Sequence, residues 1–330
     1  MPDWDSAPHP PLLVGDPSVS TPVLRRCADG GSSFTVVTPE GISGLAVFER
    51  SFDDELAAVR LQRCGAVVIQ RGQTGLLRVC TANGVVSWDG STWLHKPLAD
   101  EYVALITTLA PHADPAVAAG LLELAVHALA AGCVGSTLVW NLDGHALDDR
   151  REGLLELSQA VQPPGLSVAR RAHFPALVSI HSQVDLATII GADGTVGPIG
   201  VRLNSTRRAI SLVQATLGAR HTSARRFTFD VPGVLALVVS ESGRVTVFSG
   251  GGVAAHISPG RRDDQSSRAP AGDPHTLIVD CRSCEKQIAL ELGDPGRSRN
   301  MEPVACPACG HELNQPAGGR VIGIPVSSGP

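Results

Sequence analysis

The chain has 330 residues, of which 43% are hydrophobic, 18% charged and only 4% aromatic. This length and composition allow one large domain or two to three smaller ones, with cores built from aliphatic side chains. The formal net charge of −5 argues against bulk electrostatic binding of nucleic acid, and no apolar run approaches the length that spans a bilayer.

Residues 1–22 hold many proline and serine residues without a periodic pattern, which predicts a flexible tail. A basic region followed by an apolar one is absent from the first eleven residues, so we expect a cytoplasmic protein that makes no membrane contact. The two lysines, Lys96 and Lys286, follow no glycine-rich phosphate loop, which excludes a Walker-type ATPase. Arginine, histidine and backbone N–H groups must therefore make any phosphate contacts.

Residues 23–97 predict a β-rich domain, for which we expect a sensor role. Short apolar runs alternate there with Gly, Asn and Asp turns. The predicted strands cover residues 33–37, 45–48, 65–69, 76–80 and 84–88, and residues 52–60 predict a short helix. No catalytic constellation stands out in this domain, and its pattern does not indicate what it senses.

Residues 98–257 predict an α/β domain with a mixed sheet flanked by helices, because helical and strand patterns alternate. Asp114 and Pro115 form a helix start, and we interpret His127 as an ordinary helix-face residue. The predicted helices cover residues 100–109, 114–132, 151–161 and 205–217, and the predicted strands 135–140, 184–190, 195–196, 234–239 and 244–248. Residues 176–180 fit either element.

Three segments of this domain place charged side chains at turns and strand ends. Asp185 heads a predicted strand that turns through Asp193-Gly194, a strong hairpin signal. Gly218-Ala219-Arg220-His221 brings a guanidinium and an imidazole to a glycine turn, and both groups donate hydrogen bonds to phosphate oxygens. The apolar run 234–239 then ends on Ser240-Glu241.

In this order, the segments Asp185-Leu186-Ala187, Gly218–Thr222 and Ser240-Glu241 resemble the nucleotide-binding domain of diadenylate cyclases, which condense two ATP molecules into cyclic di-AMP. That family carries Asp-Gly-Ala, Gly-Thr-Arg-His-Arg and Ser-Glu at these places. Here Leu186, Ala219 and Thr222 replace a glycine, a threonine and an arginine. We expect the replacements to change the nucleotide, weaken turnover or abolish it, and we expect Arg225 or Arg226 to restore the lost charge.

The resemblance also implies roles for individual residues. Asp185 is the implied catalytic carboxylate, acting on the attacking hydroxyl or on a Mg²⁺ or Mn²⁺ ion, and Arg220 and His221 are the implied catalytic phosphate ligands. The implied nucleotide contacts are Leu186, Ala187, Gly218, Ala219, Thr222, Ser240 and Glu241. Because one domain does not supply both nucleotides, the resemblance further implies two ATP sites that face each other in a homo-oligomer.

The last part of the chain predicts a linker and a zinc ribbon. Residues 258–273 are rich in Pro, Gly, Ser and charge, as linkers are. In residues 274–330, Cys281 and Cys284 form one close pair, and Cys306 and Cys309 form a second pair after a 21-residue gap. Two such pairs predict a closed structural Zn²⁺ site without a catalytic role, and a pair of redox dithiols is the alternative. If the protein binds nucleic acid, we expect the arginines of this ribbon to make the contacts.

Three functions therefore follow from the sequence, and it favours the first. The first is an enzyme, a diadenylate cyclase-like nucleotidyltransferase. The second is a catalytically degenerate module that senses a nucleotide or dinucleotide, and the third is an interaction or scaffold protein that acts through the zinc ribbon. Incubation with labelled ATP and Mn²⁺ or Mg²⁺ separates the three, because only the enzyme forms a new product and only the scaffold binds no nucleotide.

Overall fold

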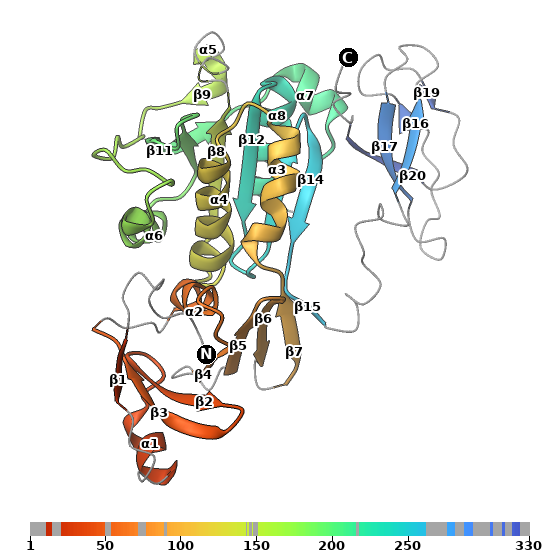
Figure 1. Cartoon of the computed structure of the whole chain (residues 1–330). Coiled ribbons are helices and arrows are strands. Elements are labelled where there is room, and N and C mark those ends of the chain that lie inside the picture. The colour runs from red at the N-terminus through yellow and green to blue at the C-terminus, as the bar shows by residue number, and fades with distance from the viewer. Residues whose placement is uncertain are drawn as a thin grey trace. The chain divides into compact units, whose positions relative to one another are not determined.

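The computed structural model describes residues 11–14, 21–49, 54–71, 77–88, 91–142, 144, 147, 151–215 and 218–261, and beyond these only strands between residues 276 and 323. The chain forms two compact units. Unit 1 comprises residues 1–101 and 258–265, and unit 2 comprises residues 102–257 and 266–330 (Figure 1). Within the described residues, no helix is both long and apolar enough to cross a bilayer.

Unit 1 is built from two antiparallel sheets and two helices. The smaller sheet has the order β1 (Leu12–Val14), β3 (Gly41–Val47), β2 (Ser33–Thr38). The larger sheet has the order β15 (Gly260–Arg261), β7 (Trp93–Lys96), β6 (Gly84–Trp88), β5 (Leu77–Thr81), β4 (Val68–Arg71). The helices are α1 (Thr21–Cys27) and α2 (Glu55–Gln62). Phe48, Leu61 and Val68 share one core, so both sheets and α2 pack together.

Three features of unit 1 differ from the sequence expectation. Leu12–Val14 lies in the predicted tail but pairs with β3, and Gly260–Arg261 lies in the predicted linker but pairs with β7. Strand β7 itself was not predicted. All three are very short strands, whose length gives almost no periodic signal, and β1 and β15 pair with strands that lie far away in the sequence. The predicted helix is present, with the Asp54 carboxylate accepting a hydrogen bond from the Ala57 N–H at 2.6 Å.

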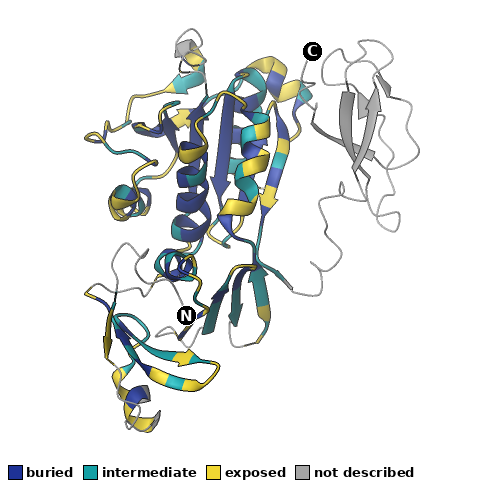
Figure 2. Ribbon diagram, in the orientation of Figure 1, coloured by how far each residue is buried: buried dark blue, intermediate teal, exposed yellow. Residues whose placement is uncertain are grey.

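Unit 2 contains a seven-stranded mixed sheet, as the α/β pattern predicts. Its order is β14 (Gly252–Ile257), β13 (Val245–Ser249), β12 (Val234–Val239), β8 (Ser136–Asn141), β10 (Ala187–Ile190), β11 (Val196–Leu203), β9 (Leu155–Glu156). The central pair β8 and β10 is parallel, and all other pairs are antiparallel. Every residue of β8 and of β12 is buried, which explains the continuous apolar run of β12 (Figure 2).

Helices cover both faces of this sheet. Helices α3 (Val103–Leu109) and α4 (Pro115–Glu123) lie over one face, and α8 (Ala219–Asp230) lies on the other (Figure 1). The remaining helical elements are η2 (Ala99–Tyr102), η3 (Leu124–Leu129), α5 (Arg151–Leu154), η4 (Arg171–His173), α6 (Phe174–His181) and α7 (Arg207–Leu212). Element η3 continues α4 as a π-helix and buries His127 to 1% exposure, so His127 does belong to a helix but lies in the core.

The described residues after position 273 form short antiparallel strands. One sheet has the order β16 (Thr276–Asp280), β17 (Gln287–Leu292), β20 (Gly319–Gly323). A second pair joins β18 (Val304–Ala305) to β19 (Glu312–Leu313).

Two helix predictions in unit 2 are wrong in extent, and one helix was missed. The predicted helix 151–161 ends at Leu154, because Gly153 adopts a φ of 83° and the next two residues pair with β11. The predicted helix 205–217 is confined to α7. Helix α8 was read as a glycine turn, because its polar sequence shows no apolar stripe that would predict a helix.

Gly120 in α4 is expected to resist replacement by alanine. A Cβ atom at this position would lie 2.3 Å from the carbonyl oxygen of buried Val168. We expect Gly120→Ala to lower the free energy of unfolding by about 1–3 kcal/mol through overpacking, although alanine is intrinsically the better helix former by about 1 kcal/mol. Urea unfolding measures the change.

The half-buried neighbour Ala119 supplies the matched control for this prediction. Ala119→Gly tests propensity alone and is expected to cost about 1 kcal/mol. A Gly120→Ala protein at least as stable as the wild type would contradict the prediction.

Candidate functional site

Asp185 and Arg220 meet in unit 2, although 35 residues separate them in the sequence. Arg220 donates from Nε and Nη2 to Asp185 Oδ1 at 3.2 and 3.1 Å, and from Nη1 to Glu241 Oε1 at 3.3 Å. One guanidinium therefore joins two carboxylates. Both carboxylate side chains are 70% exposed, so a ligand has access to them.

The ends of strands and of one helix position these three side chains. Asp185 stands two residues before β10, Arg220 is the second residue of α8, and Glu241 lies in the turn between β12 and β13. Gly135, directly before β8, makes room for the guanidinium, because a Cβ atom there would lie 2.2 Å from Arg220 Nη1 and 3.0 Å from Glu241 Oε1. Gly135 is not among the residues predicted for the site, because its only sequence signal is a glycine directly before a buried strand.

The carboxylate of Asp185 is held in its ionised form. The backbone N–H of Leu186 lowers the pKa of Asp185 most, and the hydrogen bonds and positive charge of Arg220 lower it further against the opposing effect of partial burial. An ionised, exposed carboxylate next to a guanidinium is able to attract a cation or accept a proton from a hydroxyl group.

Leu186 adopts a backbone conformation that side chains disfavour. Its φ is 75°, in the left-handed region, where the Cβ atom of a bulky residue is strained. The resembled family carries a glycine at this place, and the structure shows that the backbone retains a glycine-type conformation. The leucine side chain is 39% exposed, so packing recovers little of the strain.

This conformation predicts an unusual order of stabilities at position 186. We expect Leu186→Gly to be more stable to urea than Leu186→Ala by about 1 kcal/mol, because only glycine adopts a positive φ without strain. The matched reference is Ala224 within α8, where Ala224→Gly should destabilise by about 1 kcal/mol or more. Equal stability of the two variants at position 186 would contradict the strain argument.

His221 and the other motif residues of α8 have contacts that do not include Asp185. His221 Nε2 lies 3.4 Å from Thr246 Oγ1, which lies 3.2 Å from His256 Nδ1, and the His221 ring packs edge-on against Phe248. Burial lowers the pKa of His221, and the nearby charges lower it further. The structure therefore brings Arg220, but not His221, into contact with Asp185.

A pocket of about 700 Å³ lies on a third side of α8. Gly218, Ala219 and Thr222 line it together with Arg226. Arg226 also donates from Nε to the Val213 carbonyl at 3.1 Å. The motif residues therefore lie in two separate surroundings, because Asp185, Arg220 and Glu241 do not line this pocket.

Of the two arginines proposed to replace the missing charge, only Arg226 lines the pocket. The Arg225 side chain is buried and donates from Nε to the Gly251 carbonyl at 2.7 Å, so the expectation that it restores the charge is not supported. Two other predicted nucleotide contacts lie in different surroundings, since Ala187 packs in the core at 2% exposure and Ser240 Oγ lies 3.0 Å from Ser242 Oγ. Their contacts with a nucleotide stay predictions.

The carboxylates at this site fit a divalent cation that binds together with a nucleotide. Within the described residues, no group of three or more His, Cys, Asp or Glu side chains is arranged to hold a metal ion by itself. Asp185 and Glu241 would supply two oxygen ligands, since Mg²⁺ commonly binds through one or two carboxylates plus phosphates and water. The predicted zinc ligands Cys281, Cys284, Cys306 and Cys309 lie outside the described residues.

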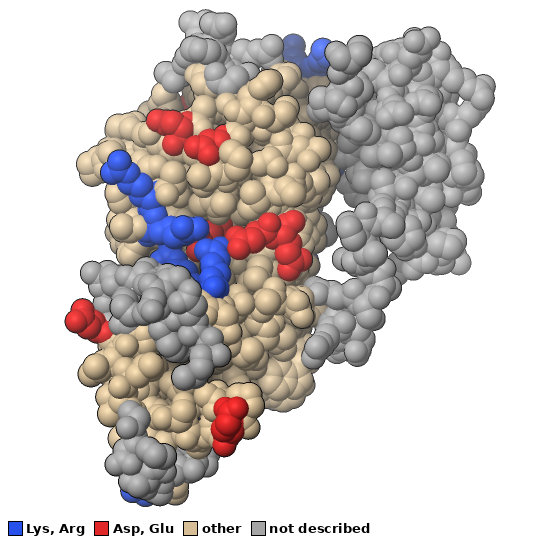
Figure 3. All heavy atoms as spheres, viewed as in Figure 1, with Lys and Arg blue, Asp and Glu red and all other residues tan. Residues whose placement is uncertain are grey.

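Figure 3 shows how charged side chains are distributed over one face of the molecule. On the uncovered part of the face in Figure 3, basic side chains gather in one narrow group with acidic side chains beside it. Sequence-independent binding of nucleic acid relies on an extended basic surface. This face offers none among its described residues.

Comparison with known proteins places the site within a recognised domain. Residues 123–253, which contain Asp185, Arg220 and Glu241, match the family model described as DisA bacterial checkpoint controller nucleotide-binding. Residues 13–97 match the model described as probable sensor domain DACNK. The resemblance to the diadenylate cyclase domain is therefore confirmed for this part of the chain, and no curated protein matches the sequence.

Two solved structures are also similar to the chain. One is titled a hypothetical membrane spanning protein from Bacillus cereus; it is 22% identical, with a TM-score of 0.33, over 49% of this chain and 78% of that one. The other is a double mutant of DacA from Staphylococcus aureus; it is 13% identical, with a TM-score of 0.28, over 47% of this chain and 85% of that one.

Proposed function

We propose that unit 2 condenses two ATP molecules, or related nucleotides, into cyclic di-AMP or a close relative. The observation that carries the proposal is the guanidinium of Arg220 joined to the carboxylates of Asp185 and Glu241 inside the matched nucleotide-binding domain. This arrangement places N–H groups that are able to donate hydrogen bonds to a phosphate next to an ionised carboxylate. Nucleotidyl transfer needs both kinds of group at one site.

Each half of the reaction forms one phosphodiester bond. The 3′-oxygen of one nucleotide attacks the α-phosphorus of the other, the bond to pyrophosphate breaks, and the Asp185 carboxylate accepts the hydroxyl proton. Arg220 donates hydrogen bonds to the phosphate oxygens. A divalent ion held by Asp185 and Glu241 would offset the phosphate charge. Since each domain presents one nucleotide, two copies of the chain face each other in the active assembly.

A nucleotide sensor without catalysis is the second candidate. The strained Leu186 favours it, because a leucine side chain occupies the place where the family has backbone only. Ala219 lacks the hydroxyl group of the family's threonine, and Thr222 lacks the positive charge of the family's arginine. Each lost phosphate contact costs roughly 1–3 kcal/mol of binding free energy.

Labelled ATP with Mn²⁺ or Mg²⁺ distinguishes these candidates. Mass spectrometry of the products and calorimetric titration of ATP are carried out on the full chain. A cyclic dinucleotide with released pyrophosphate supports the enzyme. Binding without product under any nucleotide pairing supports the sensor, and absence of binding rejects both and leaves the scaffold role.

For the C-terminal segment, we propose a tetrathiolate zinc site. Its support is the spacing of the paired cysteines Cys281, Cys284, Cys306 and Cys309. We expect metal analysis of protein purified without chelator to give one zinc per chain, and we expect Cys306→Ser to lose it. The matched control is Cys133→Ser, an exposed free cysteine in unit 2 that should leave the zinc content unchanged. Protein that holds no zinc when purified in this way would contradict the proposal.

A further inference from the structure

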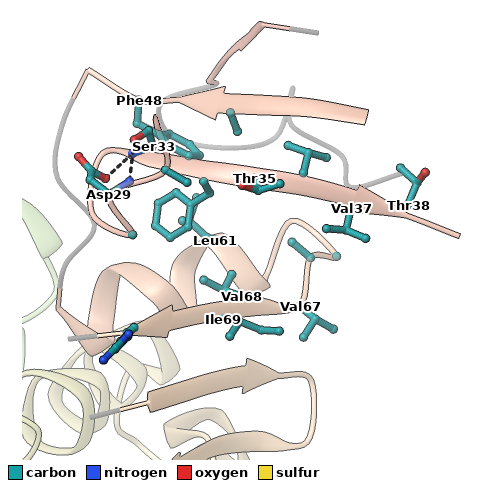
Figure 4. A pocket seen from close by; sticks show the side chains of 18 of the residues that line it. Asp29, Ser33, Thr35, Val37, Thr38, Phe48, Leu61, Val67, Val68 and Ile69 are labelled. Carbon is teal, nitrogen blue, oxygen red and sulfur yellow. Dashed lines mark hydrogen bonds between the residues drawn. The ribbon is translucent and has the colours of Figure 1, made fainter. Parts of the chain in front are cut away.

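Strands β2 and β4 border an opening of about 1080 Å³ in unit 1 (Figure 4). Each is the last strand of its sheet, so among the described strands each has a neighbour on one side only. Phe34, Phe48 and Leu61 line the space between them, and the last two belong to the unit 1 core. An outer strand edge carries backbone N–H and C=O groups that are available for pairing.

The two strands run in opposite directions along this groove. The Gln70 side-chain amide of β4 donates to the Gly30 carbonyl at 3.2 Å, which joins the end of β4 to the loop before β2. The beginning of β4 therefore lies toward the far end of β2, where Figure 4 shows Val67 near Val37. An extended chain in the groove would thus follow both strands.

Apolar side chains are exposed at the open part of the groove. Val37, Val67 and Ile69 are 68%, 64% and 62% exposed, although all three are large aliphatic residues, and all three line the same opening. Exposed apolar side chains grouped in this way mark a binding surface more often than isolated ones do.

Charged side chains lie at both ends of the groove. Exposed Glu40 lies in the turn after β2, and exposed Arg71 ends β4 near Gly30. Asp29, the neighbour of Gly30, lies at the Arg71 end, where its carboxylate accepts hydrogen bonds from the backbone N–H groups of Gly31, Ser32 and Ser33, which favour the ionised form. The Val37 end therefore carries an acid alone, whereas the other end carries Arg71, the one basic residue among the residues that line the groove, together with Asp29.

We propose that this groove binds an extended apolar peptide segment of a partner protein, which adds as a strand antiparallel to β2. Antiparallel addition places the start of the peptide near Glu40 and its end near Arg71, so a basic first residue and an acidic last residue complement the groove. A peptide pairs with the backbone of β2 at alternate residues, whereas an acyl chain would leave those groups without partners. This inference concerns unit 1 and goes beyond the proposed nucleotide chemistry, on which it does not rest.

Two synthetic probes of equal composition test the proposal on the full chain. The first is acetyl-Lys-Val-Thr-Val-Thr-Val-Glu-amide with a fluorophore, and the second exchanges its Lys and Glu. We expect fluorescence anisotropy to show at least fivefold tighter binding of the first probe at low salt, and a smaller ratio in 0.5 M NaCl, because exposed charge pairs are weak individually and screened by salt.

A charge-exchanged protein provides the decisive control. Glu40→Lys with Arg71→Glu changes only exposed side chains, so it should fold, and it should reverse the preference between the probes. Val37→Asp should weaken both probes at least tenfold, while Val23→Asp, at an exposed valine outside the groove, should weaken neither. The proposal is overturned if the two probes bind equally, if neither binds, or if the exchanged protein keeps the wild-type preference. It is also overturned if dodecylmaltoside, which carries an acyl-like chain, displaces the first probe below its micellar concentration.

Discussion

Asp185→Asn is expected to reduce the formation of cyclic dinucleotide by at least about a hundredfold. Asparagine keeps the shape of the side chain but removes the charge and the proton acceptor, and a positioned general base typically contributes a factor of about 10²–10⁴. The free energy of unfolding should change by less than about 1 kcal/mol, because Asp185 is 70% exposed and its ion pair with Arg220 is screened by water. Product formation is followed by mass spectrometry, and stability by urea unfolding.

The same substitution at Asp193 is the matched control for this prediction. Asp193 lies in the turn between β10 and β11, where its carboxylate accepts hydrogen bonds from the N–H and hydroxyl of Thr195 at 2.9 and 2.8 Å. Asp193→Asn should therefore affect local stability but keep the rate within about twofold of the wild type. If Asp185→Asn retained half of the wild-type rate, the proposed role of Asp185 would be wrong.

His181 is expected to make unit 2 sensitive to acid. The side chain is 5% exposed, its Nδ1 lies 2.9 Å from Ser136 Oγ, and its Nε2 has no hydrogen-bond partner within the described part of the chain. Burial lowers the pKa of His181 from 6.5 to about 4. The folded state therefore disfavours the protonated form, so stability is fully present above pH 6.5 and is lost as the pH falls from 6.5 to about 4.

We expect protonation of His181 to lower the free energy of unfolding by about 3 kcal/mol between pH 7 and pH 4. This value follows because each unit of difference between the unfolded and folded pKa corresponds to about 1.4 kcal/mol. Urea unfolding of the wild type and of His181→Asn at both pH values isolates this contribution as the difference between their pH dependences. His112→Asn, which replaces an exposed histidine of the same unit, should retain the wild-type dependence. Parallel pH profiles for the wild type and His181→Asn would refute the prediction.

The sequence was most informative where chemistry and local pattern coincide. The mixed sheet follows from apolar runs such as 234–239, and the Asp193-Gly194 turn joins β10 to β11 as the hairpin signal predicts. A nucleotide site requires a carboxylate near phosphate donors, and the structure does place Asp185 in contact with Arg220. Their roles in catalysis stay predictions.

Other parts of the fold and site depend on contacts that no local pattern contains. Helix α8 was missed because its polar residues serve three different surroundings, so no apolar periodicity arises. The separation of His221 from Asp185 follows from that helix, since neighbouring residues on a helix point about 100° apart. Gly135 became visible as a site residue only through the side chains of Arg220 and Glu241, which come from distant segments.

The pairing of β15 with β7 affects the order in which a ribosome-bound chain is able to fold. Strand β7 ends at Lys96, but its partner Gly260–Arg261 is made only roughly 160 residues later, after the whole sheet of unit 2. At synthesis rates of about 5–20 residues per second, this delay is about 8–30 s. During this time one edge of β7 lacks its partner, so unit 1 completes its larger sheet only after the seven strands of the mixed sheet in unit 2 have been translated.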